Sequence, residues 1–145
     1  MSEFHIRPAT SDDLGMIYSS WSAGQHSCPP WCLEPDELFR PRHRAFMDRC
    51  MERGATLVAT PPDDDPTGDE ILGWLCYEMA GDTLVVHWLY VKNAYREMGV
   101  ASELLETAAP AYDGPVVATG CSKMMLKWIQ KRVEVIFDPG LVGRA

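Results

Sequence analysis

Apolar and polar positions alternate at the start of the chain and then recur at helical spacing. Residues 4–8 alternate as in a half-buried strand. A helix is expected behind a capping residue at Thr10 or Ser11, because apolar side chains then recur at helical intervals. These side chains are Leu14, Ile17, Tyr18 and Trp21. From Ser22 to Pro41 the pattern is broken by the run CPPWC, and no regular element is expected there.

The middle of the chain predicts a second helix followed by three strands. Residues 45–53 have helical spacing, and residues 56–60 have the pattern of a short strand. Residues 61–70 contain paired prolines, consecutive aspartates and a glycine, which is typical of a solvated hairpin loop. Residues 71–79 and 83–91 predict longer strands, and the short link between them suits a hairpin.

The last third of the chain predicts two further helices, each followed by a strand. Helical spacing over residues 101–108 stops at Pro110, and residues 116–118 then form a short strand. Ser122 is expected to cap another helix, and residues 133–137 are expected to form the last strand. The predicted order is therefore strand, two helices, three strands, helix, strand, helix and strand.

Composition limits the classes of protein to which the chain can belong. Its 145 residues suit a single domain, which at this length buries roughly 70% of the surface of the unfolded chain. No apolar run suits a membrane span or a signal peptide, so we expect a cytoplasmic protein without a membrane partner. Five cysteines, an odd number, favour reduced thiols. The net charge of −8 argues against a nucleic-acid partner, because such surfaces need clustered Lys and Arg.

Candidate chemistry is concentrated in residues 85–105, where an apolar strand gives way to a polar turn and then to a helical pattern. The junction reads REMGVA over residues 96–101. Small residues at the start of a helix let backbone N–H groups approach a phosphate at the positive end of the helix dipole. The glycine spacing matches neither the dinucleotide fingerprint nor the Walker pattern. The junction is therefore a candidate anion cradle of another kind.

The junction resembles the coenzyme A-binding signature of the GCN5-related N-acetyltransferase (GNAT) superfamily, Arg/Gln-x-x-Gly-x-Gly/Ala behind a strand. Arg96, Gly99 and Ala101 fill its defined positions. The resemblance implies that backbone amides of the turn hold the pyrophosphate of acetyl-CoA, the acyl donor, and that the preceding strand pairs with the pantetheine arm. The implied cofactor-binding residues are Leu89, Tyr90, Val91, Arg96, Glu97, Met98, Gly99, Val100 and Ala101.

The resemblance covers nearly the whole chain, because the predicted order of elements is the order that the GNAT fold produces. It implies an α/β (α+β) fold class, with one GNAT-like acyl-CoA-binding domain over residues 1–145. The implied architecture is a central, mixed, mostly antiparallel twisted sheet of about six strands, flanked by about four helices.

In this family an acceptor amine attacks the acyl thioester directly, and the amine must first be neutral. Histidine has an unperturbed pKa near the working pH, which makes His87 the predicted catalytic base. Counted from Gly99, it falls where serotonin N-acetyltransferase carries one of two strand histidines. The second histidine, and the glutamate base of histone acetyltransferases, would both fall at Val85. The alternative is that His87 is a strand residue packed beside Trp88.

The sequence departs from the family at the group that protonates the departing thiolate. Many members place a tyrosine in a segment resembling Tyr-x-Lys-x-Gly-Phe, whereas residues 128–133 here read WIQKRV. Cys121, Ser122, Tyr90 or water could take its place. The departure keeps open an alternative in which the fold is a catalytically inactive binding module.

The acceptor side of this fold is lined by the first two helices and the connection between them. The predicted substrate-binding residues are Trp21, His26 and Trp31, since two tryptophans could form an apolar or cation-binding wall. The alternative is that the tryptophans cap the core. His26, Cys28 and Cys32 suggest zinc ligands, but no second ligand pair accompanies them, so no metal is expected.

The predicted function is an acyl-CoA-dependent N-acyltransferase acting on a small-molecule or protein amine, with a homodimer as one assembly. The run HWLYVKNAYREMGVA and the tail over residues 133–142 also look like small GNAT-like proteins encoded by phages and prophages. This likeness adds two alternatives, a phage structural or interaction module and a nucleobase-modifying enzyme. The acidic net charge counts against the second.

Overall fold

The computed structural model describes residues 4–62, 70–96, 98–120 and 135–142. Within them, six strands form one sheet in the order β1-β2-β3-β4-β5-β6. The strands are β1 (His5–Pro8), β2 (Ala55–Thr60), β3 (Gly73–Ala80), β4 (Thr83–Val91), β5 (Val116–Ala118) and β6 (Val135–Phe137). Pairing is antiparallel from β1 to β4 and parallel from β4 to β6. The predicted mixed, mostly antiparallel sheet is confirmed.

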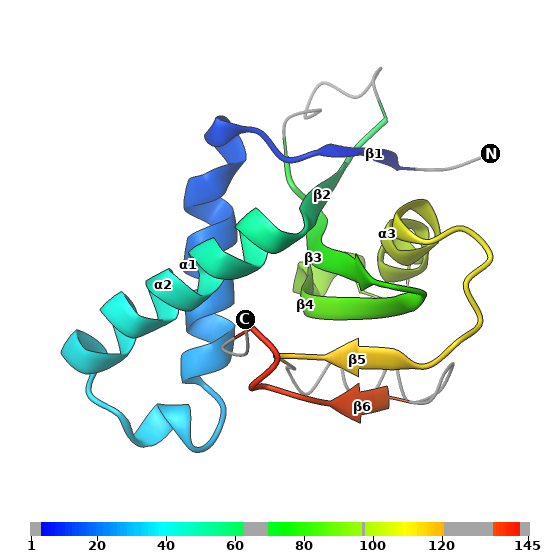
Figure 1. Ribbon diagram of the computed structural model, residues 1–145. Coiled ribbons are helices and arrows are strands. Elements are labelled where there is room, and N and C mark those ends of the chain that lie inside the picture. The colour runs from blue at the N-terminus through cyan, green and yellow to red at the C-terminus, as the bar shows by residue number, and fades with distance from the viewer. Residues whose placement is uncertain (1–3, 63–69, 97, 121–134, 143–145) are drawn as a thin grey trace.

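Helices lie on both faces of the sheet (Figure 1). The described helices are α1 (Leu14–His26), α2 (Asp36–Arg53) and α3 (Val100–Ala108). Short 3₁₀ turns occupy Ser11–Asp13, Trp31–Leu33 and Asn93–Tyr95. The further helix expected behind Ser122 falls outside the described residues. In Figure 1, α1 and α2 cover one face, and α3 covers the other. None of the helices in the described part of the chain has the length and apolarity needed to cross a membrane.

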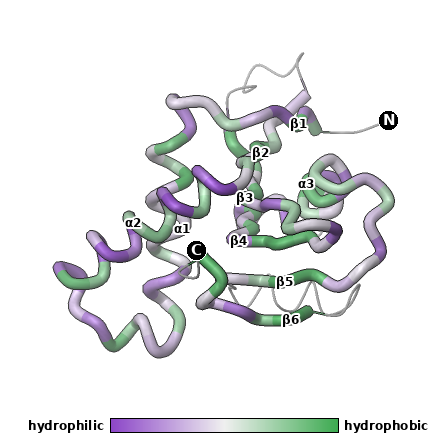
Figure 2. Tube along the Cα trace, in the orientation of Figure 1, coloured by the Kyte–Doolittle hydropathy of each residue, from purple (hydrophilic) through white to green (hydrophobic). Residues whose placement is uncertain are grey.

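Each face of the sheet has its own buried cluster, so successive residues of a strand pack alternately into one cluster and the other. On the α3 face, β3 and β4 contribute Leu75 and Leu89 to a cluster with Leu104 of the helix. On the opposite face, Trp74 and Trp88 pack with side chains of α1 and α2. Green, hydrophobic segments run along β4 and β5 in Figure 2, whereas purple, hydrophilic stretches recur along α2.

The expectation of an irregular segment from Ser22 to Pro41 was wrong at both ends, although no α-helix or strand lies between His26 and Asp36. Helix α1 continues to His26, and α2 begins at Asp36, with Pro41 inside it. Asp36 and its acidic neighbour occupy the first turn, where negative charge favours the helix dipole. Proline within a helix costs about 3 kcal/mol. Burial of apolar side chains of α2 on both sides of Pro41 offsets that cost, and these are Phe39 and Met47.

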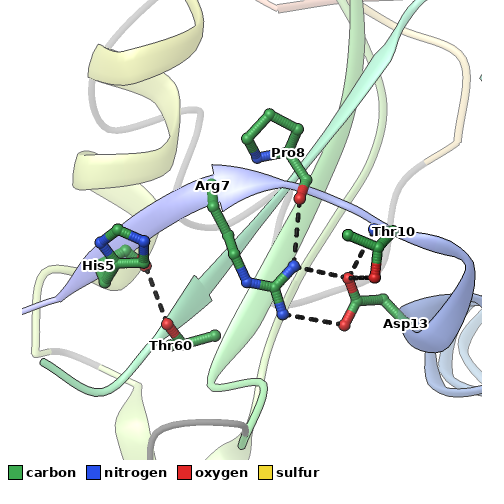
Figure 3. A network of polar contacts seen from close by, with 6 residues as sticks. All are labelled: His5, Arg7, Pro8, Thr10, Asp13 and Thr60. Atoms are coloured by element: carbon green, nitrogen blue, oxygen red, sulfur yellow. Dashed lines mark hydrogen bonds and ion pairs between the residues drawn. The ribbon is translucent and has the colours of Figure 1, made fainter. Parts of the chain in front are cut away.

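A charged network joins β1 to the start of α1 (Figure 3). Arg7 donates two hydrogen bonds to the carboxylate of Asp13, at 2.7 and 3.1 Å. The backbone N–H of Thr10 donates to the same carboxylate at 2.7 Å. The hydrogen bonds from Arg7 hold the pKa of Asp13 below its usual value, although burial acts in the opposite direction. The network fixes where α1 leaves the sheet.

Candidate functional site

Strand β4 carries a bulge at His87. Across the β3–β4 pair, Trp88 lies opposite Cys76 and Val86 lies opposite Tyr77, so His87 has no partner of its own. The sides of the strand confirm this, because Val86 packs on the α3 face and Trp88 on the other, whereas an unbroken strand would put both on one face. A bulge of this kind redirects a side chain and is common beside functional sites.

Strands β4 and β5 are paired for only part of the length of β4. The parallel ladder ends at Val86 and Ala118, followed by a hydrogen bond from the N–H of Thr119 to the carbonyl of Val86 at 3.1 Å. Strand β4 itself continues to Val91. Its β5-side edge over residues 89–91 is therefore outside the described ladder with β5. This is the stretch that was predicted to receive the pantetheine arm.

His87 is completely buried, with an exposed fraction of 0%, and both its ring nitrogens have partners. Nδ1 lies 2.7 Å from Oγ1 of Thr119, the residue that follows β5. Nε2 lies 2.8 Å from Oε1 of Glu78 on β3. The same oxygen of Glu78 lies 3.1 Å from Nε of Arg53 at the end of α2. The bulge thus brings side chains from β3, β4, the residue after β5 and the end of α2 into one polar chain.

Burial dominates the electrostatics of this chain. It lowers the pKa of His87 below its usual value, while the hydrogen bond and charge of Glu78 oppose the shift, and the charge of Arg53 adds to it. The imidazole is therefore neutral near pH 7. Neutral histidine has one N–H and one lone-pair nitrogen, so it can accept a proton.

The predicted anion cradle lies at the other end of β4. Gly99 is the N-cap of α3 and has a left-handed backbone conformation, with φ +89°. Its adjoining residues aside, no atom of the described part of the chain lies within 4 Å of the position that its Cβ would take. A glycine N-cap offers no side-chain acceptor to the N–H groups of the first turn, which also lack acceptors within the helix. These amides face the helix N-terminus, where an anion is favoured.

Arg96 holds the turn against the strand that precedes it. Its Nε donates to the carbonyl of Val91 at 3.0 Å, and a terminal guanidinium nitrogen donates to Oδ1 of Asn93 at 3.2 Å. Of the remaining predicted cradle residues, Val100 and Ala101 are buried through their side chains, and Met98 is exposed. Glu97 lies outside the described residues. In this structure, Arg96 fixes the shape of the turn.

A cavity of about 210 Å³ opens beside Thr119. It lies between the α1–α2 connection and the end of β5, and its walls combine aromatic rings with polar groups. The residues that define it are Gln25, Trp31, Phe39, His43, Phe46 and Thr119. Nε2 of His43 has no hydrogen-bond partner among the described residues. An ion pair between Arg42 and Glu34 also borders the cavity.

The three predicted acceptor contacts, Trp21, His26 and Trp31, lie in different parts of the structure. Trp31 is half-buried and lines the cavity. His26 lines a different groove, of about 700 Å³, between α1 and α2. Its Nε2 lies 2.8 Å from the carbonyl of Glu34, and its ring stacks on Phe39. Trp21 is fully buried, so the core interpretation describes it better than a contact with an acceptor.

No group of three or more potential metal ligands occurs among the described residues, so the structure does not join His26 with Cys28 and Cys32 in a metal site. Of the residues considered for protonating the thiolate, Tyr90 is half-buried on β4 beside Trp74. Cys121 and Ser122 lie outside the described residues.

Two residues of the site were missed from the sequence. Glu78 gave one usable signal, as the lone charged residue in the apolar run over residues 71–79. Thr119 gave none, because a threonine after a short strand is ordinary. The bulge at His87 was also beyond prediction, since the run VVHWLYV is compatible with an unbroken strand.

Comparison with known proteins supports the same fold. The model of the Acetyltransferase (GNAT) family matches residues 17–132. A search of curated proteins found no match. Among solved structures, an acetyl transferase from Pyrococcus furiosus has 17% sequence identity and a TM-score of 0.55, with 94% of this chain and 82% of that chain covered. A Corynebacterium glutamicum structure, described as histone acetyltransferase HPA2 and related acetyltransferase, has 21% identity, a TM-score of 0.53 and coverages of 77% and 74%.

A third structure, an acetyltransferase from Exiguobacterium, has 19% identity and a TM-score of 0.52, and 90% of this chain and 83% of that chain are covered. At such identities these likenesses establish the fold alone. The family model carries the assignment, because its match extends over most of the chain. The chain belongs to the GNAT family of acetyltransferases.

Proposed function

We propose that this protein is an acyl-CoA-dependent N-acetyltransferase that transfers an acetyl group from acetyl-CoA to an amine by direct attack. The observation that carries the proposal is the arrangement along β4. Its β5 ladder ends beside the bulge at His87, and its far end leads to the glycine-capped start of α3. One strand would thus connect a proton acceptor with an anion cradle.

The donor would lie along the β5-side edge of β4. Backbone groups of residues 89–91 would bind the pantetheine arm, because the described ladder with β5 ends before them. The N–H groups of the turn from Glu97 to Ala101 would hold the pyrophosphate at the positive end of the α3 dipole. Gly99 would keep the backbone accessible to the phosphates, since its surroundings are open. Bound acetyl-CoA supplies the activated acetyl thioester.

The acceptor would occupy the cavity beside Thr119. At about 210 Å³ it has room for one ring or a short chain, which suits a small amine or the end of a protein side chain. Trp31 and the phenylalanines of α2 would contact the apolar part of the acceptor. The unpaired Nε2 of His43 would give it a hydrogen bond. A cytoplasmic location, a homodimer and the phage-like character stay predictions.

Calorimetric titration with acetyl-CoA tests the donor site. The variant Gly99→Glu adds a negative charge at the cradle and is expected to weaken binding at least about tenfold, since a pyrophosphate and a carboxylate repel each other. Gly81→Glu is the matched control. Gly81 also has a positive φ and open surroundings, so it shares the backbone strain and the charge change, but it lies in the β3–β4 turn. Affinity within twofold of wild type is expected for this control.

Two outcomes would contradict the donor site: no heat with millimolar acetyl-CoA, or equal losses of affinity in both variants. Turnover is measured separately, as release of CoA thiol in the presence of a panel of primary amines. Binding of acetyl-CoA without any amine-dependent thiol release would favour the alternative of an inactive binding module.

A further inference from the structure

We propose that Thr119 is the catalytic residue that takes the proton from the acceptor amine, and that His87 and Glu78 form a relay behind it. This inference rests on the proposed function. It assigns to a hydroxyl group the contact with the acceptor that was predicted for the imidazole. The imidazole then acts one step away from the substrate.

Burial and geometry exclude direct contact between His87 and an acceptor in this structure. The ring is completely buried, and each nitrogen already has a partner, at 2.7 Å and 2.8 Å. A general base must reach the proton that it removes within hydrogen-bond distance or through one water. The hydroxyl of Thr119 stands where such a water would be needed, because Thr119 lines the cavity and also contacts Nδ1 of His87.

The direction of the hydrogen bonds follows from the chemistry of the three groups. The carboxylate of Glu78, paired with Arg53, can only accept a hydrogen bond. Nε2 of neutral His87 must therefore carry the ring proton, and this N–H donates a hydrogen bond to Glu78. Nδ1 is then the lone-pair nitrogen, so the hydroxyl of Thr119 donates to it. The oxygen of Thr119 keeps a lone pair that can accept an N–H from the cavity side.

This arrangement has the order carboxylate, imidazole and hydroxyl that serine hydrolases use to activate an alcohol. Here the alcohol would pass a proton rather than attack. An N–H proton of the acceptor ammonium moves to Oγ1 of Thr119 as the hydroxyl proton of Thr119 moves to Nδ1 of His87. The carboxylate of Glu78 stabilises the imidazolium that results.

The free amine then attacks the thioester carbon. The C–N bond forms, and the C–S bond breaks with its electron pair leaving on sulfur. The second amine proton goes to that sulfur, which gives CoA thiol and the acetylated amine. His87 finally returns its proton through Thr119 to water. The net products are the amide, CoA thiol and one proton, so atoms and charges balance.

The first experiment compares the variants Thr119→Val and Thr119→Ser in the thiol-release assay, with the most active amine of the panel. Valine has the shape of threonine without the hydroxyl, and we expect kcat to fall at least about 100-fold, the usual size of a general-base contribution. Serine restores the hydroxyl and is expected to regain most of that loss. Thr107→Val, an exposed position near the end of α3, is the control for a threonine-to-valine change.

The second experiment determines the tautomer of His87, which tests the relay without any measurement of turnover. Nitrogen chemical shifts of ¹⁵N-histidine-labelled protein at pH 7 distinguish the two neutral tautomers of His87, with His87→Gln used to assign its signals. We expect the tautomer protonated at Nε2. The tautomer protonated at Nδ1 would overturn the relay, because Thr119 could not then pass a proton to that nitrogen.

The outcomes separate the relay from the proposed function. Wild-type turnover in Thr119→Val, with amine-dependent thiol release intact, would overturn the relay alone. No amine-dependent turnover in wild-type protein would overturn both. Affinity for acetyl-CoA close to wild type is expected in both Thr119 variants, which shows that a fall in kcat does not reflect unfolding or loss of the donor.

Discussion

Lowering the pH from 7 to 5 should destabilise this protein through His43, a residue outside the proposed relay. Its ring is only 7% exposed and stacks between Phe39 and Phe46, with centroid distances of 4.8 and 5.9 Å. Burial, with a smaller contribution from the charge of His26, lowers the pKa of His43 from 6.5 to about 4. The folded protein therefore resists protonation at this position, whereas the unfolded chain does not.

The sign and size of the effect follow from that difference in pKa. Because the folded pKa is the lower one, the contribution is fully present above pH 6.5 and is lost as the pH falls toward 4. At pH 5 the unfolded chain is almost fully protonated at this position and the folded protein hardly at all. The free energy of unfolding should then be about 2 kcal/mol smaller than at pH 7 on account of His43.

Urea unfolding of wild type and His43→Phe, each at pH 7 and pH 5, isolates this contribution. Phenylalanine keeps an aromatic ring between Phe39 and Phe46 but does not titrate. Wild type should lose about 2 kcal/mol more than the variant between the two pH values. Titrating groups that do not interact with His43, including His87, are common to both proteins and cancel, and His26 makes only the smaller contribution. Equal losses in the two proteins would refute the claim that His43 is held neutral by burial.

Two further results are expected. Gly54→Ala should destabilise the protein by about 3 kcal/mol in urea unfolding, since its Cβ would lie 2.0 Å from the carbonyl oxygen of Tyr77. The control Gly15→Ala, at an open position on helix α1, should instead stabilise the protein by about 0.5 kcal/mol. Equal effects of the two substitutions would contradict the packing argument. Glu78→Gln should move the acid limb of the pH–rate profile to lower pH, because Glu78 raises the pKa of His87; an unmoved limb would show that His87 does not titrate in catalysis.

The sequence predicted the order of the described elements because each one carries a local signal. An apolar run marks β4, helical spacing marks α3, and both strands of the central hairpin lie within two residues of their predicted bounds. The prediction of where α2 begins was wrong, and the reason is also local. The broken pattern up to Pro41 predicts no helix before residue 45, whereas burial of Phe39 and Met47 lets α2 begin at Asp36 with Pro41 inside it.

One part of the candidate site is indicated by residues that are neighbours in sequence, and the other part depends on residues that are distant in sequence. The turn around Gly99 depends on neighbours in sequence, because it lies between a predicted strand and a predicted helix, and the structure makes Gly99 the N-cap of that helix. The polar chain does not, because Glu78, His87 and Thr119 meet through strand register, and Thr119 stands 32 positions beyond His87. Register depends on a bulge that no local pattern indicates. Sequence alone could therefore name the histidine but not the groups that determine what it can do.

The bulge at His87 does not serve the pairing of β3 with β4, although the proposed relay depends on it. Without His87, Val86 and Trp88 would be consecutive, their sides would alternate regularly, and their partners Tyr77 and Cys76 are already consecutive. The strand pair would then be the more regular ladder. His87 is thus the residue of β4 that the pairing could lose most easily and that the proposed relay could not lose at all. Selection for folding alone would have little reason to keep it there.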